Sequence, residues 1–266
     1  MNHQNDSKRP PVDVSAPLVE ALGLARRDAQ RDQVLLQPAD FALHGGERVV
    51  LTGPSGSGKS VFLRALALLD PLDGGTVRWH GEAVARAQIP SYRRHIAYLR
   101  QRPALIDGSV EDNLRYPYSL AVYRDTRFDA ARVHALFDAT GRGADFLTRA
   151  ASELSGGEAQ IVALVRVLQL DPEALLLDEP TASLDPESAR EVEALVEQWF
   201  ELRRETRATA WISHDPAQAA RVGTRHITMR AGVLDASPAP SAEKPSAAQP
   251  SVAPAATRQA ASGEAQ

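Results

Sequence analysis

One short glycine-rich segment constrains the fold of this chain more than any other feature. Residues 53–60 follow the pattern G-x-x-x-x-G-K-S and lie between the apolar residues 49–51 and 61–63. The glycines let the backbone curl so that N–H groups point at phosphate oxygens, and Lys59 at the following helix start adds a positive charge. Ser60 can ligate Mg²⁺. The predicted phosphate-binding residues are Gly53, Pro54, Ser55, Gly56, Ser57, Gly58, Lys59, Ser60 and Val61.

Short apolar runs alternate with longer helical patterns along the middle of the chain. The predicted strand and helix pairs are residues 48–52 with 59–69, 174–178 with 186–205, and 209–213 with 216–222. Such alternation predicts an α/β fold in which helices cover a parallel sheet. From about residue 91 to 167 the patterns are helical, with no clear strand after Leu99, which predicts an inserted helical subdomain.

Both ends of the chain differ in composition from the middle. In residues 237–266, Ala, Pro and Ser supply 20 of the 30 positions. A segment of that composition cannot bury enough apolar surface to offset the entropy lost on ordering. Residues 1–16 are similarly polar, so the folded domain is predicted to span about residues 17–236, with a disordered segment at each end.

Composition excludes several classes of site. The chain has 266 residues, no cysteine and a formal charge of −4, so disulfides and thiolate metal sites are absent, and a broad cationic surface for nucleic acid is not expected. No window approaches the 18 or so uninterrupted apolar residues of a membrane-spanning helix, and the first twenty residues lack the core of a signal peptide. These features predict a soluble, cytoplasmic protein.

Two carboxylates follow an apolar strand pattern. Asp178 and Glu179 come directly after residues 174–177 and precede Pro180. Beside a phosphate-binding loop, Asp178 can hold Mg²⁺ through water, and Glu179 can polarise the water that attacks a γ-phosphate. Asp-Glu-Pro alone is an ordinary exposed turn, but its combination with the Lys59 loop favours the catalytic interpretation.

A second glycine motif begins another predicted helix. Ser155 can cap that helix, and Gly156 and Gly157 leave backbone N–H groups bare at its start, which makes a second anion site. Simple helix capping explains the serine but not the paired glycines. Because one nucleotide does not need two such sites, we expect this one to serve a nucleotide held by another subunit.

Taken together, these residues resemble the nucleotide-binding subunit of an ATP-binding cassette (ABC) transporter. The motifs that carry the resemblance, in order, are the phosphate loop at 53–60, a Q-loop glutamine at Gln101, the signature at 154–160, the Walker-B strand at 175–179, a D-loop at 182–185 and a switch histidine at His214. The resemblance implies a P-loop NTPase core with an N-terminal antiparallel β region and an inserted helical subdomain that carries the signature.

The resemblance also implies a mechanism that uses ATP and Mg²⁺. Two copies of the chain would close head to tail, so that Ser155, Gly156 and Gly157 bind the γ-phosphate held by the partner. Asp185 would link the two sites. Hydrolysis would then reopen the homodimer and drive a separate permease, with this subunit on the inner face of the membrane.

Two further residues take roles from the same resemblance. Gln101 would contact Mg²⁺ or the attacking water and sense the membrane partner. His214 would contact the γ-phosphate and help to orient Glu179. The expected catalytic set is therefore Glu179, His214, Gln101 and Lys59, and the expected metal-binding set is Ser60, Gln101 and Asp178.

One departure concerns the nucleotide base. Similar proteins usually have an aromatic residue, which stacks on adenine, about sixteen residues before the Gly46–Glu47 pair, but residues 28–31 of this chain are Asp-Ala-Gln-Arg. The planar guanidinium group of Arg27 or Arg31 is expected to take its place.

A narrower resemblance concerns the transported substrate. Residues 98–117, followed by a short helical subdomain, are similar to the ATP-binding subunit of a small two-component exporter proposed to export iron. Apolar residues after Gln101 are candidates for docking a permease helix, and the alternative is local packing: Leu105, Ile106, Tyr116 and Tyr118.

Two other functions compete with transport. A non-transport ABC ATPase would act as a mechanical clamp on nucleic acid or ribosomes, but such relatives usually fuse two cassettes or insert a long coiled coil, and residues 61–153 show no sustained heptads. A P-loop kinase of small metabolites would leave the signature at 154–160 without a role.

Overall fold

The computed structural model describes residues 16–235, and the predictions for residues 1–15 and 236–266 lie outside that range. The strands are β1 (Val19–Asp28), β2 (Gln33–Leu43), β3 (Arg48–Thr52), β4 (Gly74–Trp79), β5 (Glu82–Ala83), β6 (Ile96–Leu99), β7 (Ala174–Asp178), β8 (Ala208–Ile212), β9 (Arg225–Arg230) and β10 (Val233–Asp235). The helices are α1 (Lys59–Leu66), α2 (Ile89–His95), α3 (Val110–Arg115), α4 (Ala130–Asp138), α5 (Gly156–Leu168), α6 (Pro186–Glu201) and α7 (Pro216–Val222). Short 3-10 turns lie at Arg86–Gln88, Tyr116–Ser119, Ala121–Tyr123, Ala144–Thr148 and Ala151–Glu153.

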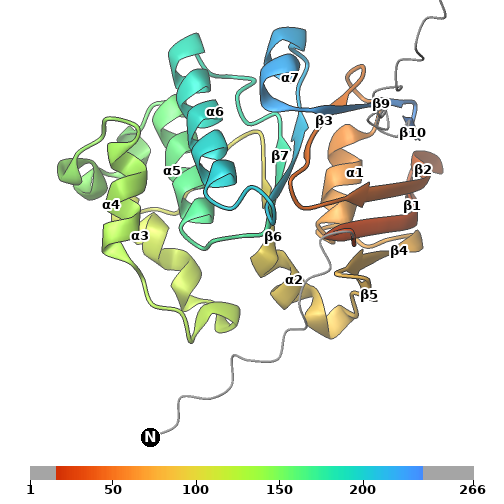
Figure 1. Ribbon diagram of the computed structural model, residues 1–266, viewed down its shortest axis with the longest axis horizontal. Coiled ribbons are helices and arrows are strands. Elements are labelled where there is room, and N and C mark those ends of the chain that lie inside the picture. Colours follow the sequence, from red (N-terminus) through yellow and green to blue (C-terminus); the bar gives the residue numbers. More distant parts are fainter. Residues whose placement is uncertain (1–15, 236–266) are drawn as a thin grey trace, which may run out of the picture.

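A six-stranded sheet forms the centre of the domain, in the order β10-β9-β3-β8-β7-β6 (Figure 1). All neighbouring pairs in it are parallel except β10 and β9. The predicted α/β fold with a parallel sheet is therefore confirmed. Because the carboxyl ends of parallel strands meet at one edge, the segments after β3, β6, β7 and β8 gather there.

A second, antiparallel sheet has the order β2-β1-β4-β5 and confirms the expected N-terminal β region. Helix α1 lies between this sheet and one face of the central sheet (Figure 1). The buried side chains of Leu36, Phe62 and Leu176 share one apolar cluster from these three layers. The helix that follows the phosphate-binding loop is thus buried at the centre of the domain.

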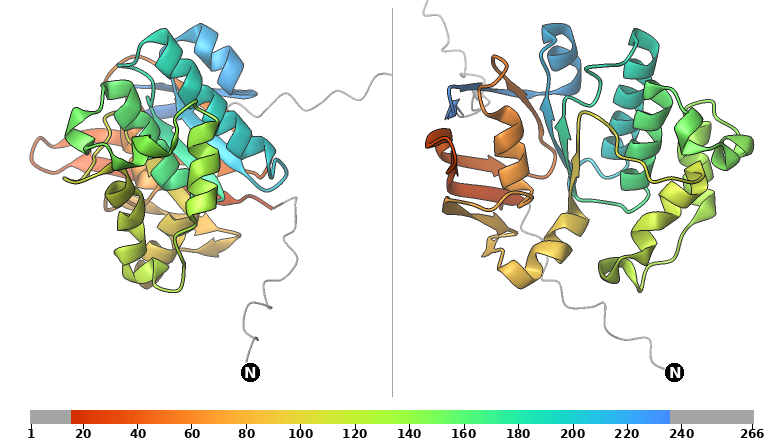
Figure 2. Two further views of the ribbon diagram at one scale, coloured as in Figure 1. Left: turned by 90° about the vertical axis from the view of Figure 1, so that its left-hand side faces the viewer. Right: turned by 180° about the vertical axis from the view of Figure 1, so that it is seen from behind.

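The opposite face of the central sheet carries α5 and α6. Strand β7 is buried along its whole length and alternates between the two faces, with Leu176 on the α1 side and Leu175 and Leu177 on the α5 side. Helices α3 and α4 pack onto this second cluster, far from the β1–β2 hairpin (Figure 2). No helix within residues 16–235 combines the length and the apolar character needed to span a bilayer.

Some predicted boundaries are corrected by the structure. Helix α2 and strand β6 contribute Tyr92 and Ile96 to the cluster around α1, so the helical insertion starts after Leu99 rather than near residue 91. Helix α1 ends at Leu66 because Leu68 adopts a left-handed backbone conformation, and Leu69 beyond it is 41% exposed. Helix α6 ends at Glu201, four residues before the predicted end.

Candidate functional site

The predicted phosphate-binding loop connects the end of β3 to the start of α1. Its backbone has positive φ angles at Gly53, Gly56 and Gly58, where side chains are strained. A Cβ atom at Gly53 would lie 2.1 Å from the Met229 carbonyl oxygen, and one at Gly58 would lie 2.8 Å from the carbonyl oxygen of Leu35. The neighbouring strands therefore require glycine at both positions, and the loop curls as the sequence predicts.

Lys59 points back into this loop. Its ammonium group donates hydrogen bonds to the carbonyl oxygens of Gly53 at 2.9 Å and Pro54 at 3.0 Å, and only 4% of the residue is exposed. Burial lowers the pKa of Lys59, while the nearby charges of Glu179 and Asp178 act in the opposite direction. A buried ammonium group held by two neutral carbonyls is a strong site for a phosphate oxygen.

Asp178 is held by hydroxyl groups from two other elements. Its Oδ1 accepts a hydrogen bond from Ser60 at 2.8 Å, and its Oδ2 accepts one from Tyr98 at 2.6 Å. Carboxylate and hydroxyl oxygens are the ligands that Mg²⁺ prefers, so Ser60 and Asp178 fit a magnesium site. Tyr98 is not among the predicted site residues, and its position three residues before Gln101 is the sequence signal that could have found it.

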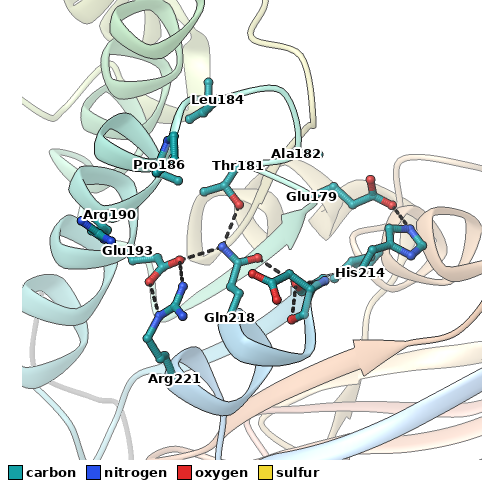
Figure 3. Close-up of a pocket in the computed structure, with 14 residues that line it drawn as sticks. Glu179, Thr181, Ala182, Leu184, Pro186, Arg190, Glu193, His214, Gln218 and Arg221 are labelled. Atoms are coloured by element: carbon teal, nitrogen blue, oxygen red, sulfur yellow. Dashed lines mark hydrogen bonds and ion pairs between the residues drawn. The ribbon is translucent and has the colours of Figure 1, made fainter.

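Glu179 and His214 face each other across the ends of neighbouring strands. Asp178 and Ile212 are register partners in β7 and β8, so the residues that follow these strands leave the sheet side by side. Nε2 of His214 lies 2.6 Å from Oε1 of Glu179 (Figure 3). Glu179 has a φ of 49°, which turns it away from the direction of Asp178.

Lys59 and the Glu179–His214 pair line one cleft of about 870 Å³. Residues 55–61 of the phosphate-binding loop contribute to it, together with Gln101, Glu179 and His214. The structure thus brings together most of the predicted catalytic and metal-binding residues. Gln101 also lines an adjoining groove of about 800 Å³ together with Ser60 and Asp178.

Ser155 to Gly157 do not line that cleft within the described chain. Ser155 caps α5: its hydroxyl oxygen accepts from the Glu158 amide at 3.2 Å, and the Glu158 carboxylate accepts from the Ser155 amide at 2.8 Å. A Cβ atom at Gly156 would meet no heavy atom within 4 Å, so the start of α5 is open there. The signature therefore forms a separate surface from the Lys59 cleft.

Gly157 brings the start of α5 against the start of α6. A Cβ atom at Gly157 would lie 2.4 Å from Oγ of Ser188. That Ser188 hydroxyl donates to Asp185 at 2.7 Å, and Asp185 caps α6 by accepting from the Glu187 and Ser188 amides. Hydrogen bonds from Ser188 lower the pKa of Asp185. Asp185 does not line the Lys59 cleft and lies beside the signature instead.

The remaining wall of the cleft comes from β2 and the turn between β9 and β10. Strand β2 contributes Gln33, Val34 and Leu35, and the turn contributes Ala231 and Gly232. No Phe, Tyr or Trp side chain among the described residues lines this cleft. Val34 is 38% exposed.

The two arginines expected to replace the aromatic residue have carboxylate partners in the β1–β2 hairpin. Arg27 pairs with Asp32 at 3.2 Å, and Arg31 with Asp28 at 3.8 Å. Arg27 is the register partner of Val34, so both side chains lie on the same face of the hairpin.

The four candidate docking residues divide into two groups. Ile106 and Tyr116 are exposed at the surface. Leu105 packs partly against the α5 side of the core, and Tyr118 packs edge-on against Phe128 with ring centroids 5.7 Å apart. The local-packing alternative therefore holds for Leu105 and Tyr118.

Comparisons with known proteins give a matching family and several relatives. A family model described as ABC transporter matches residues 36–182. Protein STAR1 of Oryza sativa subsp. japonica is 36% identical over 225 residues, which cover 84% of this chain but only 64% of STAR1. The probable iron export ATP-binding protein FetA of Escherichia coli strain K12 is 35% identical, over 69% of this chain and 80% of FetA. The phosphate import ATP-binding protein PstB 2 of Natronomonas pharaonis is 37% identical, over 77% of this chain and 75% of PstB 2.

Solved structures share the fold at lower identity. Among them, cbiO1 of Clostridium perfringens, part of the ABC transporter complex cbiONQ, has a TM-score of 0.69 at 21% identity and covers 83% of this chain and 87% of its own. The ATP-binding cassette MJ0796, solved as a dimer with ADP and Pi, has a TM-score of 0.71 at 24% identity and covers 82% of this chain and 96% of its own. At these identities the likeness supports the fold alone.

Proposed function

The chain belongs to the ABC transporter family as an ATPase, and we propose that it closes as a head-to-tail dimer on ATP to drive a separate membrane permease. The observation that supports this proposal is that the two predicted phosphate-binding segments lie on separate surfaces of one chain. Lys59, Ser60 and Glu179 line one cleft, whereas the open helix start at Gly156 lies outside it. A second copy is the natural source of the missing half of each site.

In the proposed mechanism the phosphate-binding loop holds the β- and γ-phosphates of ATP. The backbone N–H groups of the loop and of the first turn of α1 would donate hydrogen bonds to the phosphate oxygens of ATP. The Lys59 ammonium group exchanges its bonds to the Gly53 and Pro54 carbonyls for bonds to phosphate oxygens. That exchange pairs a buried cation with an anion, and so favours binding.

Ser60 and Asp178 are the residues that would hold Mg²⁺, and Gln101 lines the adjoining groove together with both of them. When bound, the ion neutralises charge on the β- and γ-phosphates. The Ser60 hydroxyl oxygen would be one ligand of the ion, and the hydrogen bond from Tyr98 would keep the Asp178 carboxylate oriented for it.

Glu179 acts as the general base in this mechanism. The attacking water forms a bond to the γ-phosphorus and gives a proton to Glu179 as the bond to the ADP oxygen breaks. Because Oε1 of Glu179 contacts His214, Oε2 remains to accept that proton. His214 thereby fixes the direction of the carboxylate and also faces the terminal phosphate from the same cleft.

The partner copy completes the site. Gly156 presents a bare helix start, and Ser155 can extend its hydroxyl group to a γ-phosphate by giving up its capping bond to the Glu158 amide. Asp185 lies beside Gly157. A movement of the signature when it binds phosphate would therefore displace the D-loop. ATP thus forms part of the dimer interface, and hydrolysis weakens it.

Coupling to a permease is proposed to pass through Gln101. This residue lines both the Lys59 cleft and the adjoining groove, and the exposed side chain of Ile106 follows a few residues later. A permease helix bound at this groove would contact Gln101, so a movement of Gln101 in the Lys59 cleft would be passed to the permease. Such docking places the subunit on the inner face of the membrane.

The finer proposal concerns the substrate and is export of a metal, with iron as the first candidate. It is supported by the 35% identity to a protein named as a probable iron export subunit. Relatives named for phosphate import and for sulfate or thiosulfate import match at similar identity. Copurification of the membrane partner from detergent-solubilised membranes, followed by metal efflux from loaded vesicles, tests this proposal. Recovery on ribosomes or DNA instead would favour the clamp function.

Substitution of Lys59 tests the ATPase assignment. Lys59→Ala is expected to reduce ATP affinity by at least about a hundredfold, because a charge-assisted phosphate contact is lost in a buried site. Arg203→Ala is a matched control, since Arg203 is an exposed cation paired with Asp171 outside the cleft. Full ATPase activity in Lys59→Ala would contradict the assignment.

A further inference from the structure

A buried glutamine lies behind the Glu179–His214 pair and is not used by the mechanism above. Gln218 belongs to the first turn of α7 and is only 7% exposed. Its side chain lies at a pocket of about 690 Å³ between α6, α7 and the loop after β7, and Glu179 and His214 line the same pocket (Figure 3).

The amide group of Gln218 joins three elements. Its Nε2 donates to Oγ1 of Thr181 at 2.8 Å and to Oε1 of Glu193 on α6 at 2.7 Å. Its Oε1 accepts a hydrogen bond of 2.8 Å from the hydroxyl group of Ser213. Both donor hydrogens and the carbonyl oxygen are therefore engaged (Figure 3).

Glu193 sets the orientation of this amide. A carboxylate only accepts hydrogen bonds, so the group that faces Glu193 must be the NH₂ of Gln218. Arg221 holds Glu193 in place through two bonds of 3.1 and 3.0 Å. The oxygen of Gln218 therefore faces Ser213, and the orientation of the amide group is fixed.

Thr181 and Ser213 are the residues through which Gln218 reaches the catalytic pair. Thr181 is two residues after Glu179, and its loop is tightened by a bond from the Ala182 amide to the Glu179 carbonyl oxygen. Ser213 comes directly before His214, and its hydroxyl oxygen accepts from the Asp215 amide at 3.1 Å. The side-chain amide of Gln218 thus connects the segment that carries Glu179 with the segment that carries His214.

We propose that Gln218 is a positioning residue for ATP hydrolysis: it ties Thr181 to Ser213, sets His214 against Glu179, and carries displacements of residues 181–185 to that pair. The proposal rests on the proposed function, in which residues 182–185 lie at the dimer interface. It gives the closed dimer a direct mechanical route to the base that activates water. Gln218 itself contacts neither nucleotide nor metal.

The main test is Gln218→Met, which keeps the length of the side chain and removes its hydrogen bonds. A displacement of the order of 1 Å in the Glu179–His214 pair is expected to lower kcat about tenfold to a hundredfold. KM and the affinity for ATP stay within about twofold, because Gln218 does not line the Lys59 cleft. A role in stability alone would not separate kcat from KM in this way.

Thr181 provides a milder variant that does not depend on changing Gln218. Thr181→Val keeps the shape of the side chain but removes the acceptor oxygen, and should lower kcat in the same direction. Thr181→Ser retains that oxygen and should restore most of the lost turnover. The double variant Gln218→Met, Thr181→Val should turn over no more slowly than Gln218→Met, since both changes break one connection.

Gln169 is the matched control for loss of a buried amide. It is 5% exposed, and its Nε2 donates to the Leu114 carbonyl oxygen at 2.7 Å and to the carbonyl oxygen of Arg166 at 3.3 Å. It follows the C-terminal end of α5 and lines neither pocket that Glu179 and His214 line. Gln169→Met should lower Tm while kcat stays within about twofold of wild type.

The outcomes separate the two proposals. A Gln218→Met enzyme with wild-type kcat, or an equal loss of kcat in Gln169→Met, overturns the positioning role while leaving the ATPase assignment intact. A wild-type chain that hydrolyses no ATP overturns both. A kcat-specific loss in Gln218→Met and Thr181→Val, with recovery in Thr181→Ser, is the result that the proposal expects.

Discussion

The Tyr98 hydroxyl group donates a hydrogen bond of 2.6 Å to Oδ2 of Asp178, across the neighbouring strands β6 and β7. The other carboxylate oxygen accepts from Ser60 at 2.8 Å, so both oxygens of Asp178 are oriented. Burial, together with this bond to Asp178, raises the pKa of Tyr98 above its ordinary value, and the phenol therefore remains a donor at neutral pH. In the proposed mechanism, Tyr98 would affect Mg²⁺ binding only through the Asp178 carboxylate that it orients.

Tyr98→Phe is expected to raise the Mg²⁺ concentration needed for half-maximal ATPase activity by about tenfold, because a hydrogen bond to a charged group contributes roughly 1.5–3 kcal/mol. Binding of ATP without Mg²⁺ should be unchanged. Tyr92→Phe is the control, since Tyr92 is fully buried and its hydroxyl donates to the Leu66 carbonyl oxygen instead of to a carboxylate. Identical magnesium dependence in Tyr98→Phe and wild type would contradict the role of Tyr98.

The two signature glycines should respond differently to alanine. At Gly157 the added methyl group would press on Ser188, and relieving such overpacking costs about 1–3 kcal/mol. Gly157→Ala should therefore lower Tm by about 5 °C in thermal denaturation. At Gly156 there is open space, so Gly156→Ala should keep the wild-type Tm but lose ATP-dependent dimerisation. Unimpaired dimerisation of Gly156→Ala would argue against a phosphate contact at this helix start.

The base of the nucleotide should be held weakly, because aliphatic and backbone groups of β2 and of residues 231–232 replace an aromatic ring. Val34→Tyr would supply that ring and should tighten ATP binding by about fivefold to tenfold, from a stacking contribution of about 1 kcal/mol. Equilibrium titration with a fluorescent ATP analogue measures the effect. The matched change Val233→Tyr, at another exposed valine that does not line the cleft, should leave affinity unchanged. Equal affinities in all three proteins would place the base elsewhere.

Glu173 makes stability depend on pH at the junction of β4, α2 and β7. Burial would raise the pKa of Glu173, but hydrogen bonds from His80 at 2.8 Å and His95 at 3.1 Å hold it well below its usual range. A carboxyl group whose pKa is lower in the folded than in the unfolded chain stabilises the fold above about pH 4.5, and this contribution is lost as the pH falls toward the folded-state pKa.

Glu173→Gln should therefore lower Tm at pH 7, and its difference from wild type should narrow below about pH 4.5. Circular dichroism melts between pH 7 and pH 4 measure the difference. Glu201→Gln, at a half-exposed carboxylate 3.7 Å from Arg204, should change Tm little at either pH. If the difference in Tm between Glu173→Gln and wild type stays constant with pH, loss of the ion pairs of Glu173 does not explain that difference.

The parts of the fold that the sequence predicts correctly depend on local patterns. The strand 48–52, the loop 53–60 and the strand 174–178 each carry their signal within a few residues, as glycine spacing or an unbroken apolar run. Local patterns also explain why the predicted start of the helical insertion, near residue 91, is wrong: they do not show which part of the core a helix packs against. The pattern of α2 shows a helix, but not that Tyr92 packs beneath the antiparallel sheet.

The supporting residues of the site could not be predicted in this way. Tyr98 meets Asp178 from 80 positions away, and Gln218 meets Thr181 from 37 positions away. Contacts over such separations leave no periodic pattern in the sequence, because the order of strands in the sheet determines which segments meet. The positive φ of Glu179 is likewise set by the turn after β7 and leaves no mark in its residue type.

The central claim is that each ATP lies between the Lys59 cleft of one copy and the Gly156 helix start of another. Glu179→Gln removes the general base and keeps the shape of the side chain, so ATP should bind without being hydrolysed. Sedimentation velocity of this variant with saturating Mg²⁺-ATP measures the assembly directly. The account predicts a dimer with ATP and a monomer with ADP, and a variant that binds ATP yet remains monomeric at saturation would contradict it.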